Sequence, residues 1–228
     1  PGDTSIVEPA PSREHSERML RHFGAELRVD NVASGGCKIT VSGQPELSAQ
    51  ALSVPADFSS AAFPLAAALI VPGSDVLLRN VGINPMRGGF LECVREMGGA
   101  MELRNIKEIS GEPVADIAVR ATKLHGIEVA AVRAPSMIDE YPVLAVLAAC
   151  AEGPSRLCGL DDLRHKESDR FAAIVSGLSA AGCAVSAEQD DILIAGAGVP
   201  PPGGAEIASC LDHRIAMAFL VLGMALSL

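Results

Sequence analysis

The sequence predicts an α/β protein built from repeated strand and helix units, with one helix of each unit buried. Three segments each contain an amphipathic helix, a glycine and a short strand, and Gly24, Gly98 and Gly182 lie 74 and 84 residues apart. A glycine at this place supplies the left-handed conformation that ends a helix. Three alanine-rich apolar segments recur at a similar spacing, in which Pro64 and Pro142 lie 78 residues apart.

The amphipathic helices precede these glycines. We expect them at residues 12–23, 89–97 and 168–180. In the last of them, Phe171, Ile174, Val175 and Leu178 have the i, i+3, i+4, i+7 spacing of a single apolar face. Each helix is therefore expected to pack one face against the core and to leave the other in water.

The second kind of helix is apolar all round, which indicates burial on every side. We expect these helices at residues 61–71, 142–151 and 215–226. The first two are followed by small-residue turns and short strands. Together the segments predict a unit of strand, apolar helix, strand, amphipathic helix, strand and strand, repeated about every 80 residues. This period is longer than that of common solenoid repeats and favours stacked α/β units.

A domain boundary is expected at residues 52–57, where Ser-Val-Pro-Ala-Asp interrupts the pattern. Residues 1–54 would be the C-terminal part of one domain, and residues 55–228 most of a second. The chain starts with Pro rather than Met, so we expect a fragment or a processed piece of a longer protein.

The composition excludes several classes of function. The chain has 228 residues, 49% of them hydrophobic, which is enough for a sizeable core. Its 18 Lys and Arg against 28 Asp and Glu give a net charge of −10, and no basic stripe suggests a nucleic-acid or anionic-membrane surface. The longest apolar stretch, 215–228, is too short for a membrane-spanning helix. We therefore expect neither nucleic acid nor a membrane as a partner.

The six cysteines are widely separated and form no pattern of metal ligands. We expect most of them to be small buried side chains, and no metal or other cofactor. No charged segment followed by an apolar run opens the chain, which favours a cytoplasmic location.

Charged residues at predicted helix starts are the candidates for chemistry. Lys166 and Arg170 flank the start of the third amphipathic helix, where Ser168 or Asp169 can act as the cap. Free backbone N–H groups and the helix dipole favour anions there, so these cations indicate a phosphate or carboxylate site. The alternative is an ordinary solvated helix start.

Three further helix starts carry candidates. Arg214 opens the last apolar helix, where it binds an anion or pairs with Asp212 or a neighbouring acid. Asp139 precedes the second apolar helix, as its N-cap or as a general base partly desolvated by apolar neighbours. Arg13 opens the first amphipathic helix. Because stacked repeats point helix starts in a common direction, we expect these groups to converge on one small, multiply anionic ligand.

Five strings in the sequence resemble the enolpyruvylshikimate-phosphate (EPSP) synthase family. They are Ser-Arg-Glu-His-Ser-Glu-Arg-Met-Leu at 12–20, Val-Pro-Ala-Asp-Phe-Ser-Ser-Ala-Ala-Phe at 54–63, Ser-Met-Ile-Asp-Glu-Tyr-Pro at 136–142, Arg-His-Lys-Glu-Ser-Asp-Arg at 164–170 and Leu-Asp-His-Arg-Ile-Ala-Met at 211–217. The resemblance covers essentially the whole chain. Around Asp139 and Arg13 it is similar to the bacterial class II enzymes, which include glyphosate-tolerant members.

The resemblance implies two domains, each of three βαβαββ units with buried helices, an inside-out α/β barrel whose helix N-termini face a central cleft. It implies transfer of the enolpyruvyl group of phosphoenolpyruvate to the 5-hydroxyl of shikimate 3-phosphate, with phosphate release through a tetrahedral adduct. No metal or cofactor is implied. The reaction belongs to the shikimate pathway of aromatic amino-acid biosynthesis, in which glyphosate is a candidate inhibitor.

Residue roles follow from the same resemblance. Asp139 resembles the base that accepts the hydroxyl proton, and Glu167 the acid that protonates the methylene carbon. Lys166 and Arg13 resemble ligands of shikimate 3-phosphate, and Arg170 and Arg214 resemble ligands of phosphoenolpyruvate.

The family's N-terminal half, with further cationic ligands, is expected upstream of this chain, and another Lys beyond its end. We therefore expect the chain alone to be inactive. Two alternatives stay open. A UDP-N-acetylglucosamine enolpyruvyl transferase shares the fold and donor but is disfavoured by residues 166–170, and a non-catalytic anion-binding or assembly domain has the same fold.

Overall fold

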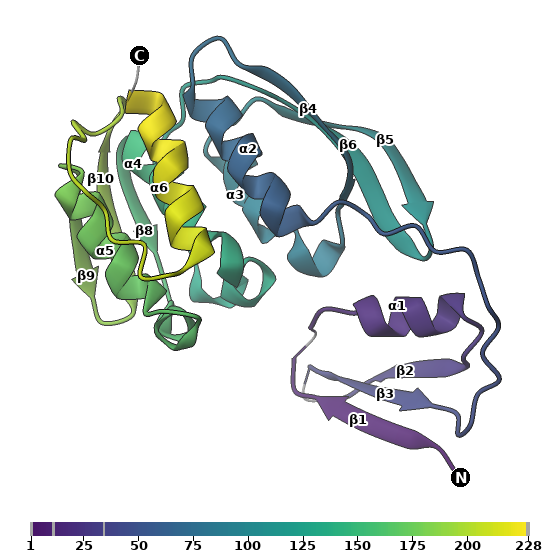
Figure 1. Cartoon of the computed structure of the whole chain (residues 1–228). Coiled ribbons are helices and arrows are strands. Elements are labelled where there is room, and N and C mark those ends of the chain that lie inside the picture. Colours follow the sequence, from purple (N-terminus) through teal and green to yellow (C-terminus); the bar gives the residue numbers. More distant parts are fainter. Residues whose placement is uncertain (1, 11, 34, 227–228) are drawn as a thin grey trace.

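The N-terminal part of the chain forms a small sheet with one helix beside it. The computed structural model describes residues 2–10, 12–33 and 35–226 (Figure 1). The sheet has the order β1-β3-β2, with both pairs antiparallel. Its elements are β1 (Thr4–Glu8), α1 (His15–His22), β2 (Leu27–Asn31) and β3 (Cys37–Val41). A long segment leads from β3 to the rest of the chain, and the proposed boundary at residues 54 and 55 lies in it and stays a prediction.

The first repeat unit follows this segment. Its sheet has the order β4-β6-β5, and Ala56 forms a parallel bridge with Val81 of the first of these strands. The elements are α2 (Phe58–Ile70), β4 (Asp75–Gly82), η1 (Pro85–Arg87), α3 (Gly89–Glu96), β5 (Met101–Ile109) and β6 (Glu112–Arg120).

The second unit has the same topology. Its sheet has the order β7-β8-β10-β9, in which the first pair is parallel and the other two are antiparallel. The elements are β7 (Glu128–Val129), η2 (Ala131–Ser136), η3 (Ile138–Glu140), α4 (Tyr141–Cys150), β8 (Glu152–Leu157), η4 (Asp161–His165), α5 (Arg170–Ala180), β9 (Ala184–Glu188) and β10 (Asp191–Ala197). The predicted βαβαββ repeat and the α/β fold class are therefore confirmed.

The glycines that marked the repeat end helices as predicted. Gly24, Gly98 and Gly182 have φ angles of 94°, 80° and 86° and are each the second residue after the end of α1, α3 and α5. A side chain at these positions would be strained, so the repeat is visible in the sequence because the backbone requires glycine there.

The three apolar helices lie side by side and form the centre of the core (Figure 1). They are α2, α4 and the last helix, α6 (His213–Leu226), and α4 contacts both of the others. Nine of the ten residues of α4 are buried. The expectation of burial on every side is wrong for α6, where Leu220 is 69% and Met224 53% exposed, along an open groove between this helix and α2. The last two residues of the apolar stretch at 215–228 lie outside the described residues.

Close packing of α5 on α6 depends on a glycine. A Cβ added to Gly177 would lie 2.2 Å from Cζ of Phe219. We expect Gly177→Ala to lower the free energy of unfolding, because overpacking usually costs about 1–3 kcal/mol. The gain of about 1 kcal/mol in helix propensity offsets part of this cost, so the net loss is expected to be about 0–2 kcal/mol.

Urea unfolding of the chain measures this effect. Gly223→Ala on α6 is the matched control, because its Cβ would meet no atom within 4 Å, and it is expected to be neutral or stabilising. Equal changes for the two variants would show that α5 and α6 do not approach as closely as described.

Candidate functional site

Three arginines from distant parts of the chain surround the carboxylate of Asp139. Arg13 Nη2 lies 3.3 Å from Oδ2, Arg170 Nη1 lies 3.2 Å from Oδ1, and Arg214 Nη2 lies 4.0 Å from Oδ2. Arg214 Nη1 also donates to the backbone oxygen of Asp139 at 3.4 Å. The structure thus brings together four of the six residues that the sequence pointed to around this carboxylate, and a fifth, Glu167, joins them through Arg170.

The fold places each of these side chains at the start of an element. Arg170 is the first residue of α5, whose N-cap Asp169 accepts a hydrogen bond from the backbone of Ala172 at 2.9 Å. Arg214 lies in the first turn of α6, and Arg13 lies directly before Glu14, the N-cap of α1. Asp139 lies in η3, the 3₁₀ turn that leads into α4.

Arg170 is fully buried and is held by carboxylates. Its Nε donates to Asp212 Oδ2 at 2.8 Å, and its Nη2 donates to Glu167 Oε2 at 2.5 Å. Ser168 Oγ donates to the same Asp212 oxygen at 3.1 Å. A buried guanidinium is stable only when its charge and its N–H groups are satisfied, and here three carboxylates do so.

Asp212 is a member of this cluster that the sequence analysis considered only as a partner of Arg214. Its side chain is 0% exposed, and it pairs with Arg170 instead. Arg214 contributes its backbone N–H, which donates to Asp212 Oδ1 at 2.9 Å. The expected ion pair of Arg214 is therefore not with Asp212 but with a neighbouring acid, Asp139, at 4.0 Å. The signal available in the sequence was a carboxylate directly before an apolar helix.

The charges around the two aspartates favour their ionised forms. Burial by itself would raise the pKa of Asp139, but Arg214, Arg13 and Arg170 hold that pKa below its ordinary value. Burial opposes ionisation of Asp212 as well, and hydrogen bonds from Arg170 and from the backbone of Arg214 lower its pKa. Both groups are therefore ionised at neutral pH.

Two sequence-based expectations differ from the structure here. Asp139 is not the N-cap of α4, because the helix begins at Tyr141 with Pro142 in its first turn, and Glu140 occupies the cap position. Lys166 lies just after η4, and within the described residues no ion pair or hydrogen bond joins it to the arginine cluster. Glu167 is in the cluster through Arg170, with its side chain 56% exposed.

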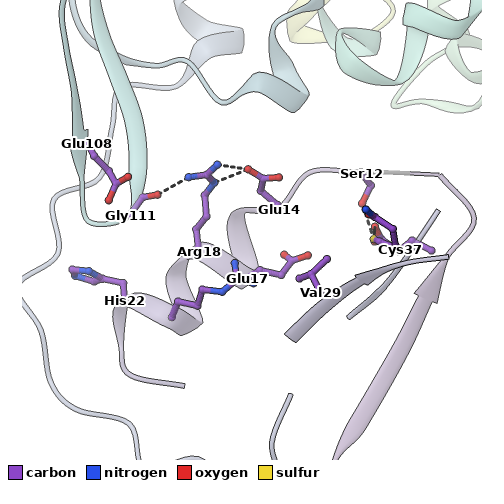
Figure 2. A pocket seen from close by; sticks show the side chains of 12 residues that line it. Ser12, Glu14, Glu17, Arg18, His22, Val29, Cys37, Glu108 and Gly111 are labelled. Carbon is purple, nitrogen blue, oxygen red and sulfur yellow. Dashed lines mark hydrogen bonds and ion pairs between the residues drawn. The ribbon is translucent and has the colours of Figure 1, made fainter. Parts of the chain in front are cut away.

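A cavity of about 670 Å³ lies between α1, the N-terminal sheet and the turn from β5 to β6. Figure 2 shows Arg18 between Glu14 and the carbonyl of Gly111, to which it donates at 3.0 Å. None of the six candidate residues lines this cavity, and four glutamates do. Its acidic lining does not suit an anionic ligand, so we place the functional site at Asp139.

The described ranges contain neither a metal-binding arrangement nor a membrane-spanning helix. No group of three or more His, Cys, Asp or Glu residues there has the arrangement of a metal site. None of the helices described is both long and apolar enough to cross a bilayer.

The fold and this cluster define a class of protein: stacked βαβαββ units with a carboxylate among arginines at the starts of their helices. Comparison with known proteins narrows the class. The family model of EPSP synthase (3-phosphoshikimate 1-carboxyvinyltransferase) matches residues 1–227, and the chain belongs to this family.

Individual relatives are similar to this chain over nearly its whole length. The 3-phosphoshikimate 1-carboxyvinyltransferase of Rhodospirillum rubrum is 55% identical over 224 residues, which are 98% of this chain and 50% of the relative. That of Methylorubrum populi is 55% identical over 227 residues, with 99% and 50% covered. The chain therefore spans about half the length of these relatives.

Solved structures support the fold. EPSP synthase from Acinetobacter baumannii superposes with a TM-score of 0.91 at 41% identity, over 98% of this chain and 51% of that one. The enolpyruvyl transferase NikO from Streptomyces tendae has a TM-score of 0.68 at 18% identity, over 98% and 49%, and shares the fold.

Proposed function

We propose that this chain forms half of the active site of a cytoplasmic 3-phosphoshikimate 1-carboxyvinyltransferase. The reaction transfers the enolpyruvyl group of phosphoenolpyruvate to the 5-hydroxyl of shikimate 3-phosphate and releases phosphate. The observation that carries the proposal is the ionised Asp139 among three arginines, in a chain of the EPSP synthase family. Both substrates carry a phosphate of about −1.5 to −2 charge, which arginines bind in bidentate fashion.

Asp139 is the proposed base. Its carboxylate accepts the hydroxyl proton as the oxygen attacks C2 of phosphoenolpyruvate. Glu167, whose side chain is 56% exposed, takes up a proton from solvent and donates it to C3, which yields the tetrahedral adduct. Loss of a proton from C3 and of phosphate from C2 restores the double bond. Phosphate groups that bind Arg13 or Arg214 would weaken the interactions that lower the pKa of Asp139, which makes the carboxylate a stronger base.

The proposed roles of the cations come from the family resemblance. Arg170 and Arg214 are proposed to hold phosphoenolpyruvate, and Arg13 and Lys166 to hold shikimate 3-phosphate. Arg13 and Arg214 keep part of their side chains exposed and contact Asp139 at 3.3 and 4.0 Å, so N–H groups remain to bind an anion. Glyphosate, an anionic phosphonate, is proposed to compete for the same arginines.

Phosphate release from the two substrates tests the proposal. The chain is assayed alone and joined to the half of the Rhodospirillum rubrum relative that it does not match. We expect negligible turnover alone, because half of the cationic shell and the exclusion of water are absent, and turnover in the joined protein.

Three outcomes contradict parts of the proposal. Robust turnover by the chain alone would refute the need for a second half. Turnover with UDP-N-acetylglucosamine in place of shikimate 3-phosphate would assign a different acceptor. Binding of shikimate 3-phosphate without any turnover in the joined protein would indicate a non-catalytic domain.

Arg214→Ala is expected to raise the KM for phosphoenolpyruvate in the joined protein. One charge-assisted contact contributes about 1.5–3 kcal/mol, which corresponds to about 10- to 150-fold. Steady-state kinetics measure the effect, with Arg104→Ala as the control because Arg104 pairs with Glu102 on the surface. A variant that melts earlier but keeps its KM would assign Arg214 to structure alone.

A further inference from the structure

A second polar cluster is centred on Glu140, the residue that follows Asp139 in η3. The side chain of Glu140 is only 2% exposed. Ser59 Oγ, in the first turn of α2, donates to Glu140 Oε1 at 2.5 Å. Arg87 Nη2 of η1 in turn donates to Ser59 Oγ at 2.5 Å and lies 3.9 Å from Glu140 Oε1. The cluster thus links the N-terminal ends of α2 and α4.

Helix capping does not explain this carboxylate. Glu140 occupies the N-cap position of α4, but its side chain makes no capping hydrogen bond there and reaches across to α2. The burial is also unfavourable, because it raises the pKa of Glu140, and the hydrogen bond from Ser59 and the charge of Arg87 offset this only in part. A buried carboxylate that adds no cap and is costly to bury suggests a positional role.

The geometry supplies that role. Asp139 and Glu140 are consecutive residues of the short turn η3, and their side chains are held by separate groups. The arginines hold the first, and the ends of α2 and η1 hold the second. Because one turn of backbone carries both, the anchor of Glu140 limits how far the carboxylate of Asp139 can move.

We propose that Glu140 is a positioning residue that, through Ser59 and Arg87, aims Asp139 at the arginine cluster. Its effect on turnover rests on the proposed function, but its effect on the position of Asp139 does not. Misplacement of a reacting group by about 1 Å costs about 100-fold in rate, so the loss of this anchor is expected to be measurable.

The first measurement uses the 228-residue chain and needs no activity. Carboxyl NMR titration follows Asp139 in the wild type, in Glu140→Ala and in Ser59→Ala. We expect both variants to raise the pKa of Asp139 toward the ordinary value of about 3.9, because its carboxylate is no longer held close to the arginines. Glu140→Gln retains the acceptor oxygen for Ser59 and is expected to recover most of the change.

The second measurement uses the joined protein. Glu140→Ala is expected to lower kcat by about 10- to 100-fold with a much smaller change in the KM for phosphoenolpyruvate. In an Asp139→Asn background the same substitution should cause no further loss, because the two residues act through one group. Glu152→Ala, at an exposed carboxylate at the start of β8, is the control and should change neither quantity.

The outcomes separate the two proposals. An unchanged titration of Asp139 in folded Glu140→Ala and Ser59→Ala, or an equal loss of kcat in the Asp139→Asn background, would overturn the positioning role. If the joined wild-type protein is inactive, the proposed function fails, and the titration alone decides the role of Glu140.

Discussion

Asp139→Asn is expected to lower kcat of the joined protein by about 10²- to 10⁴-fold, the usual effect of losing a general base. The amide keeps the size of the carboxylate but cannot accept the hydroxyl proton. It also removes the negative charge that Arg13, Arg170 and Arg214 share, so anions should bind at least as well as before. The expected signature is therefore a loss of kcat without a rise in KM.

Single-turnover phosphate release with both substrates measures this effect. Asp161→Asn is the matched control, because Asp161 is an exposed aspartate in η4 outside the cluster. If Asp139→Asn keeps the wild-type kcat, Asp139 has a purely structural role and another group takes the proton.

Arg170→Met is expected to lower the free energy of unfolding by about 3–5 kcal/mol, the largest effect on stability that we predict. Methionine fills most of the space but leaves Asp212 with a buried charge and no partner, since both side chains are 0% exposed. Asp139 and Glu167 lose a partner too, although both are more exposed.

The loss of stability in Arg170→Met is expected to depend on pH. In the wild type the pKa of Asp212 is lowered, so its contribution to stability is present above the ordinary pKa and is lost as the pH falls through the lowered value. In the variant, burial without Arg170 raises this pKa, and protonation relieves the buried charge as the pH falls. The loss of stability in the variant should therefore be smaller near pH 4, close to the ordinary aspartate pKa of about 3.9, than near pH 7.

Urea unfolding at the two pH values tests this. Replacing both members of the pair, as Arg170→Met with Asp212→Asn, should recover part of the stability, because no unpaired charge remains. Arg104→Met removes an exposed ion pair and serves as the control. A similar loss in Arg170→Met at both pH values would show that packing, and not charge, holds this residue in place.

The repeat and the kinds of helix could be predicted because they depend on local requirements. Left-handed glycines end α1, α3 and α5 whatever lies around them, and apolar residues on all sides of α4 can only be buried. The same holds for the first turn of α5, where the predicted cap Asp169 binds the backbone of Ala172. The division of the chain at residues 54 and 55 stays a prediction.

The choice of partners could not be predicted in this way. Arg170 pairs with Asp212, 42 residues away, and Ser59 donates to Glu140, 81 residues away. Sequence spacing placed Asp212 beside Arg214, but the carboxylate turns toward α5 because the buried guanidinium there needs a counter-charge. Lys166 lies in the same sequence motif as Arg170 and nevertheless stays outside the cluster.

The sequence by itself determined the repeat of strands and helices and the glycines that end helices, since left-handed turns and apolar periodicity are properties of a few neighbouring residues. Burial of every helix face was not determined in this way, as the exposed side of α6 shows. Only the tertiary structure decided which charged groups meet, because contacts between residues far apart depend on how the units stack. The pairing of Asp212 with Arg170 and of Glu140 with Ser59 belongs to that second kind of information.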